Sequence, residues 1–182
     1  MAFGDAAGEQ TQAERLEIAR RYRKRRGDEI KALAASVVAG EIDAAGEFST
    51  VPTEAIASIP GLGMLLLPVA RRRSRRSGLA PRVLIAITPD RVHALTVETA
   101  GLRRDETTVA EGKSWARPDV TAERGGRAFM RDKVLLHVPD REQPITLYAP
   151  SLRTNPWSAE VVRLLGGEAP EPFDLGGDPR GD

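Results

Sequence analysis

The residues best suited to chemistry are two histidines, His93 and His137, in a chain without cysteine. Histidine is a common metal ligand and general base near neutral pH. No His-x-His or His-x-x-x-His spacing brings the two imidazoles together, however. The lack of cysteine excludes thiolate catalysis, disulfides and cysteine-based zinc sites. We therefore expect two structural histidines within strands, no metal and no other cofactor.

Motifs for phosphate binding and covalent catalysis are also missing. Gly61-Leu62-Gly63 is followed by Met64 and three leucines, not by the Gly-Lys-Ser/Thr of a phosphate-binding loop. No serine occupies a Gly-x-Ser-x-Gly elbow. Carboxylate pairs such as Asp105 and Glu106 fall in polar turns, where acids are usually solvated. The sequence predicts a protein that is not an enzyme, and an enzyme with a site built from dispersed residues stays open as an alternative.

The strongest functional signal is an uncharged apolar segment, Ile56–Ala70, that runs directly into an arginine cluster. It is shorter than the about 20 residues that a membrane-spanning helix needs. One interpretation is an interfacial contact, in which the apolar residues enter a bilayer surface and the arginines hold anionic headgroups. The other is a buried connector whose arginines face solvent. The candidate membrane contact comprises Leu65, Leu66, Leu67, Arg71, Arg72, Arg73, Arg75 and Arg76.

A second basic run covers residues 20–26 and includes one aromatic side chain. On a helix these charges spread around most of the cylinder and could contact the phosphates of a nucleic acid. The simpler interpretation is a solvated helix whose charge is offset by Glu14, Glu17, Asp28 and Glu29. One aromatic ring offers little surface for base stacking. We therefore expect the partner to be an unknown protein or an anionic lipid surface, and we regard nucleic acid as the less favoured candidate.

Composition is that of an ordinary globular chain. The 182 residues suit one domain with extensions, and apolar residues, at 41%, supply a core. Aromatic residues, at 4%, leave little for stacking, and the formal charge of +1 gives no global attraction to nucleic acid. The first residues lack the features of a signal peptide, which predicts a cytoplasmic protein that is membrane-associated if the apolar segment is interfacial. The preference for arginine over lysine is typical of a high-GC bacterial genome.

The pattern of elements divides the chain into four regions. Residues 1–45 form a helical N-terminal region, with two helices that separate at Gly27. Residues 46–80 form a connector that holds the apolar and basic segments. Short strands closed by one amphipathic helix occupy residues 81–166, and an acidic tail rich in glycine and proline, residues 167–182, is predicted to be disordered.

Several local signals define the strand region. The continuous apolar run Val83–Ile87 predicts a strand that is buried on both faces or covered by a helix. Pro89-Asp90 is a turn pair, and Gly125-Gly126 predicts a hairpin turn. Asn155-Pro156 opens a helix with an N-cap and a first-turn proline. Trp157 begins the apolar stripe of that helix, so we expect it in the seam between helix and sheet.

This order resembles the pleckstrin-homology-like (PH-like) superfold and, more narrowly, uncharacterised bacterial PH-like proteins. The resemblance lies in the strand–turn–strand run Val83–Val92, the strand around Trp115 and the helix Asn155–Leu165. It implies an α+β fold with N-terminal helices, followed by a bent antiparallel sheet or barrel over residues 81–166. The C-terminal helix then caps one open end of that sheet.

We expect a non-catalytic binding or adaptor module, which is peripheral at the inner membrane face if the apolar segment Ile56–Ala70 is interfacial. PH domains that bind inositol phosphates carry a basic cluster in the first hairpin loop. Here the Pro89-Asp90 turn offers only Arg91, so we do not expect phosphoinositide binding. A nucleic-acid-associated protein that uses the arginine-rich N-terminal helix is the alternative from a different class.

Overall fold

The structure is a computed structural model and describes residues 12–51, 77–100, 106–128 and 131–171. Within these ranges it contains two α-helices and seven strands, which confirms the α+β class. The elements are α1 (Gln12–Ala35), β1 (Ala44–Ser49), β2 (Arg82–Ile87), β3 (Arg91–Ala100), β4 (Glu106–Ala116), the 3-10 turn η1 (Arg117–Asp119), β5 (Thr121–Ala128), β6 (Arg131–His137), β7 (Ile145–Pro150) and α4 (Pro156–Leu164).

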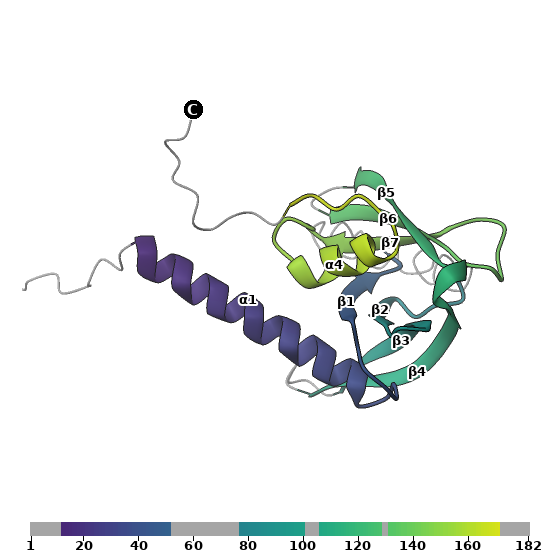
Figure 1. The fold of residues 1–182 in the computed structure, drawn as a ribbon, viewed down its shortest axis with the longest axis horizontal. Coiled ribbons are helices and arrows are strands. Elements are labelled where there is room, and N and C mark those ends of the chain that lie inside the picture. Colours follow the sequence, from purple (N-terminus) through teal and green to yellow (C-terminus); the bar gives the residue numbers. More distant parts are fainter. Residues whose placement is uncertain (1–11, 52–76, 101–105, 129–130, 172–182) are drawn as a thin grey trace, which may run out of the picture.

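All seven strands form one antiparallel sheet in the order β4-β3-β2-β1-β7-β6-β5. Most neighbours in this order are also neighbours in the chain. The exception is β1 beside β7, which pair at a single register position, Ser49 with Tyr148. The two end strands, β4 and β5, are joined by η1 alone, so the sheet has to bend to bring their linked ends together (Figure 1).

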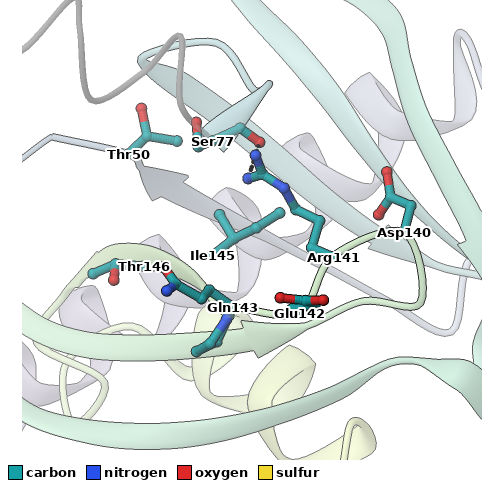
Figure 2. A pocket seen from close by; sticks show the side chains of 9 residues that line it. Thr50, Ser77, Asp140, Arg141, Glu142, Gln143, Ile145 and Thr146 are labelled. Carbon is teal, nitrogen blue, oxygen red and sulfur yellow. Dashed lines mark hydrogen bonds between the residues drawn. The ribbon is translucent and has the colours of Figure 1, made fainter.

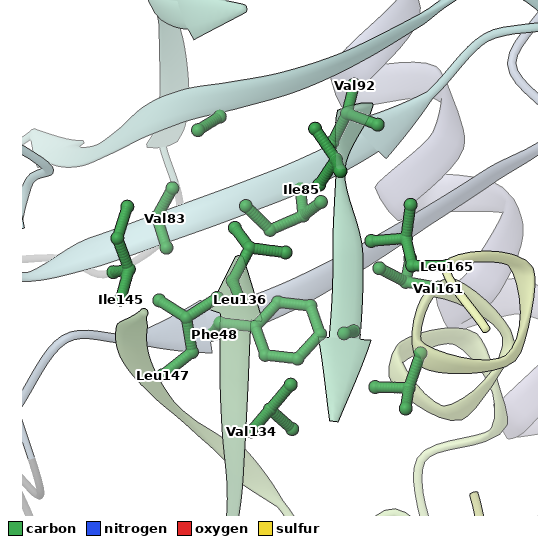
Figure 3. Close-up of a cluster of buried hydrophobic side chains, with 14 of the residues drawn as sticks. Phe48, Val83, Ile85, Val92, Val134, Leu136, Ile145, Leu147, Val161 and Leu165 are labelled. Atoms are coloured by element: carbon green, nitrogen blue, oxygen red, sulfur yellow. The ribbon is translucent and has the colours of Figure 1, made fainter. Parts of the chain in front are cut away.

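The larger hydrophobic cluster, here the α4-side cluster, includes residues from every strand and from α4 (Figure 3). The apolar run of β2 is buried throughout, as predicted, because its side chains alternate between two covered faces. Val83, Ile85 and Ile87 belong to the α4-side cluster, whereas Leu84 and Ala86 point the other way.

The smaller cluster, here the α1-side cluster, lies where the second half of α1 covers the opposite face of β1, β2 and β3. Ile30 and Ala34 of α1, with Val38 just beyond it, pack on Leu84 and Leu95. The first half of α1 extends past the sheet (Figure 1). There Ile18 is 54% and Tyr22 is 64% exposed.

The N-terminal region differs from the prediction, because one helix replaces the two expected. Gly27 lies inside α1 and does not interrupt it. Glu29 accepts hydrogen bonds from Arg25 and Arg26 across this position, and Ile30 is fully buried on the sheet. Packing of an amphipathic face contributes more to helix stability than the propensity of one residue, so the helix continues through the glycine.

The sheet also begins earlier than the expected boundary at residue 81. β1 starts at Ala44, and its alanines and glycine give it a weak strand signal. Pairing with β2 along its whole length fixes it as a strand. Gly46 has a packing role, since a Cβ there would lie 2.8 Å from the Cα of Ser158 in α4.

The predicted hairpin turn at Gly125-Gly126 is wrong. Both glycines lie inside β5, where the register against β6 shifts between Arg124 and Arg127. Gly126 has a φ of 87°, a left-handed conformation that suits glycine. Such a pair of glycines supports a β-bulge as readily as a turn, and here the strand bends and continues.

Candidate functional site

The candidate membrane contact, Leu65–Leu67 with the arginines from Arg71 to Arg76, lies outside the described residues, but both ends of its segment are described. β1 ends at Ser49, β2 begins at Arg82, and these two residues pair in the sheet. The apolar and basic segments therefore both belong to the connection between β1 and β2. The first hairpin of the sheet is therefore β1–β2, and the turn at Pro89-Asp90 joins β2 to β3.

Hydrogen bonds tie the two ends of this connection together; residues 49–51 and 77–82 are here called the loop base. The Thr50 backbone N–H donates to the Pro81 carbonyl at 2.9 Å, and the Thr50 hydroxyl donates to the Ala80 carbonyl at 3.1 Å. On the exit side, the Val51 N–H donates to the Ser49 hydroxyl oxygen at 3.2 Å. The connection thus leaves and re-enters the sheet at one point.

The return side of the loop base is also anchored in the fold. Leu79 is only 7% exposed and belongs to the α4-side cluster. Its N–H donates to the Ser77 hydroxyl oxygen at 3.2 Å. Arg141, from the turn between β6 and β7, donates to the Ser77 carbonyl at 2.8 Å (Figure 2). No local sequence signal links Arg141 to a residue so far away in the chain.

A cavity of about 440 Å³ opens beside the loop base, between Thr50, Ser77 and the turn from β6 to β7 (Figure 2). Its charged lining residues are Asp140, Arg141 and Glu142. A hydrogen bond from Lys113 at 2.8 Å, followed by one from the Trp115 indole, lowers the pKa of Asp140. With two carboxylates and one engaged arginine, these lining residues do not form a phosphate pocket.

The two histidines occupy different halves of the sheet. His93 lies on β3 opposite Ser114, and His137 lies on β6 opposite Thr121. Burial, followed by the nearby Arg91, lowers the pKa of His93. His137 Nε2 lies 3.5 Å from a carboxylate oxygen of Glu123. Among the described residues, no three potential ligand side chains gather at one point.

The basic run of α1 is partly neutralised by neighbouring carboxylates. Arg21 pairs with Glu17, and Arg25 with Glu29 at 2.9 Å. Arg26 reaches Glu47 on β1, also at 2.9 Å. These ion pairs weaken the field that a nucleic acid would meet along α1.

Comparisons with protein-family models, with curated proteins and with solved structures gave no match. Within the described ranges, neither helix combines the length and the apolar character that crossing a bilayer requires.

Proposed function

We propose that this protein is a non-catalytic binding module of PH-like architecture. The order of the seven antiparallel strands supports the proposal, as does the helix that follows the last strand. In the PH-like resemblance the C-terminal helix covers one open end of a bent sheet. Val161, Val162 and Leu165, from α4 and its C-cap, lie in the α4-side cluster, as that role requires.

The module rests on an anionic membrane surface through the connection between β1 and β2. The observation that carries this proposal is the loop base, where Thr50 bonds both Ala80 and Pro81. Because the connection begins and ends at one point, Ile56–Ala70 and the five arginines after it are presented from one place on the domain. A short apolar insertion and a basic cluster rarely hold a membrane separately, but together they supply the two signals that stable attachment needs.

In this proposal the protein recognises the overall negative charge of the membrane surface and not one particular headgroup. The basic cluster belongs to the connection between β1 and β2, the first hairpin, so the single arginine beside the Pro89-Asp90 turn is no argument against phosphoinositides. Among the described residues that line the adjacent cavity, however, Arg141 is the only cation, and it bonds Ser77. Each arginine near an anionic surface contributes roughly 1 kcal/mol, a contribution that salt screens.

Co-sedimentation with vesicles tests the proposal. We expect wild type to bind vesicles that contain phosphatidylglycerol at low salt and to bind neutral phosphatidylcholine vesicles weakly. Replacing Arg71, Arg72, Arg73, Arg75 and Arg76 with Gln removes the dependence on lipid charge and leaves the melting temperature unchanged. Replacing Leu65 and Leu66 with Ser removes the salt-resistant part of binding.

The matched control replaces the same number of cations on α1, namely Arg20, Arg21, Arg23, Lys24 and Arg25, with Gln. This variant keeps most vesicle binding if the β1–β2 connection is the contact. The buried-connector interpretation gives the opposite result: the leucine changes lower the melting temperature, the arginine changes have no effect, and wild type does not sediment. Absence of binding to anionic vesicles at low salt overturns the proposal.

A further inference from the structure

A second surface, unrelated to the loop base, lies between α1 and the start of α4. It is a groove of about 250 Å³ over the beginning of β1, here called the α1–α4 groove. Arg23, Lys24 and Lys31 line it from α1, and Trp157 lines it from α4. Figure 1 shows the two helices that form its sides, and residues of the two helices are in contact.

The groove combines positive charge with an aromatic wall. Its lining includes three cations and one carboxylate, Asp28. Lys31 donates one hydrogen bond to the Asp43 carbonyl at 2.7 Å, and an ammonium group has two further donors. Trp157 is partly buried against the α1-side cluster, which leaves part of its indole to the groove. The first turn of α4 adds a weak positive field. These features suit an acidic chain with an apolar side chain beside each carboxylate.

Gly27 is a second, independent indication of an occupant. It lies inside α1 and lines the groove. After proline, glycine is the least favourable residue in a helix interior. Its φ is not positive, and a Cβ at this position would meet nothing within 4 Å. Neither backbone conformation nor packing among the described residues requires glycine there. Glycine leaves the helix backbone uncovered on this side of the groove, so another chain can approach it closely.

The C-terminal tail of the same chain has the matching chemistry. Residues 168–182 contain five acidic residues and one arginine, and Phe173-Asp174-Leu175 places apolar side chains on both sides of a carboxylate. The described chain follows α4 closely. Gly167 donates to the Val162 carbonyl, and Ala169 packs on the α4-side cluster.

The tail is long enough to reach the groove. Its eleven residues from Pro172 to Asp182 span at most about 36–40 Å when extended. The nine residues of α4 span only about 14 Å from one end to the other. A tethered segment also acts at an effective concentration of the order of millimolar, so a weak interaction is sufficient.

We propose that the acidic C-terminal tail binds in the α1–α4 groove of its own chain, with the carboxylates of Asp178 and Asp182, near its end, beside Lys24 and Lys31. Binding requires no secondary structure in the tail. Its consequence is that the tail neutralises the basic half of α1, and a competing polyanion has to displace it before reaching these cations.

The chain offers a clean experiment because it contains no cysteine. A Gly176→Cys substitution allows a nitroxide to be attached to the tail of the full-length protein. The two tryptophan indole N–H signals in an NMR spectrum then serve as reporters. Trp157 lines the groove, whereas Trp115 belongs to the α4-side cluster and donates to Asp140 at 2.9 Å. We expect the nitroxide to broaden the Trp157 signal strongly and the Trp115 signal little, and high salt to restore most of the lost intensity.

A variant that fills the groove gives the second arm of the test. Gly27→Leu adds a side chain where there is open space and improves helix propensity, so it should fold and restore the Trp157 signal. The matched control is Ala32→Leu, on an exposed position of α1 that does not line the groove. It should leave the broadening unchanged.

Three results would overturn the proposal. The first is a Trp157 signal that the nitroxide does not affect at low salt. The second is broadening that persists in the Gly27→Leu variant. The third concerns a sample in which nitroxide-labelled chains are mixed with isotope-labelled chains that lack the nitroxide. Broadening of the isotope-labelled chains in this mixture that is as strong as in the fully nitroxide-labelled sample assigns the groove to the tail of a second copy and not to the chain's own tail.

Discussion

The two faces of the sheet are built differently, and their two tryptophans show how. The α4-side cluster includes residues from all seven strands and from α4, and Trp115 within it is 6% exposed with its indole N–H bonded to Asp140. The α1-side cluster includes one helix and the central strands, and Trp157 lies at its margin. The first cluster therefore stabilises the whole sheet, and the second attaches α1 to it.

Residues that stabilise the fold and residues near the proposed docking surface therefore lie on opposite faces of the sheet. A residue on the α4 side contacts several strands, so its loss affects the whole sheet. A residue on the α1 side affects chiefly how α1 is held, and the groove that we propose as a docking surface lies beside that attachment. The comparison predicts a series of effects that decreases from the α4-side cluster to the α1 side and then to the partly buried His93 on β3.

The largest effect is expected from Trp115→Ala. Removing a buried tryptophan costs about 3–5 kcal/mol, and this change also removes a hydrogen bond to Asp140. Urea denaturation followed by circular dichroism measures the loss. Trp115→Phe is the control, since it keeps the aromatic ring and loses the hydrogen bond, worth about 0.5–1.5 kcal/mol. Similar losses for both variants would mean that packing contributes little at this site.

A smaller and more local effect is expected from Ile30→Ala. Ile30 is fully buried under α1, and such a truncation costs about 2–5 kcal/mol. We expect a loss toward the lower end of that range, because one helix forms one whole side of the cluster. Hydrogen exchange should accelerate in α1 while β2 and β6 stay protected. Equal acceleration in all three elements would show that the two clusters unfold as one.

Trp157→Ala should cost about 1 kcal/mol, well below the value for a fully buried tryptophan. From the sequence we expect this residue in the seam between helix and sheet, and in the structure it is partly buried and lines the groove. Denaturant midpoints of this variant and of Trp115→Ala, measured side by side, test the difference. A cost as large as that of Trp115→Ala would contradict the division between the two faces.

The smallest effect is a pH dependence that arises from His93. Burial and Arg91 lower its pKa in the folded state, whereas the unfolded chain titrates near the usual value of about 6.5. The neutral ring therefore contributes stability that is complete above about pH 6.5 and declines as the pH falls toward the folded pKa. We expect a lower melting temperature at pH 5.5 than at pH 7.5, and a smaller decrease in His93→Gln. Identical decreases in both proteins would contradict this assignment.

Signals that lie within one element could be predicted from the sequence. The continuous apolar run of β2 correctly indicated burial on both faces, and Asn155-Pro156 correctly marked the start of α4. The helix break predicted at Gly27 and the turn predicted at Gly125-Gly126 were wrong. A glycine widens the range of backbone conformations that are allowed, and the packing around it decides which one is adopted. Ion pairs across Gly27 keep α1 helical there, and pairing with β6 keeps Gly125-Gly126 within β5.

Features that join distant parts of the chain could not be predicted. β1 is a strand because β2 pairs with it from beyond the long connection, and no local pattern reports that pairing. The loop base depends on Arg141 reaching Ser77, and the groove depends on Trp157 standing beside α1. Each of these requires the register of the sheet to be known first, which a single sequence does not provide.

The pairing of β1 with β7 has a consequence for how the domain folds. Every other strand pair joins strands that are consecutive among the described elements, so β2–β4 and β5–β7 are two local meanders, and β1 joins the first across residues 50–81. The two meet at Ser49 and Tyr148, and loop-closure entropy opposes this contact most strongly. We therefore expect the meanders to form first and their joining to limit the folding rate. During synthesis on the ribosome, the N-terminal strands would then be paired before β7, the strand that joins the two halves of the sheet, has been synthesised.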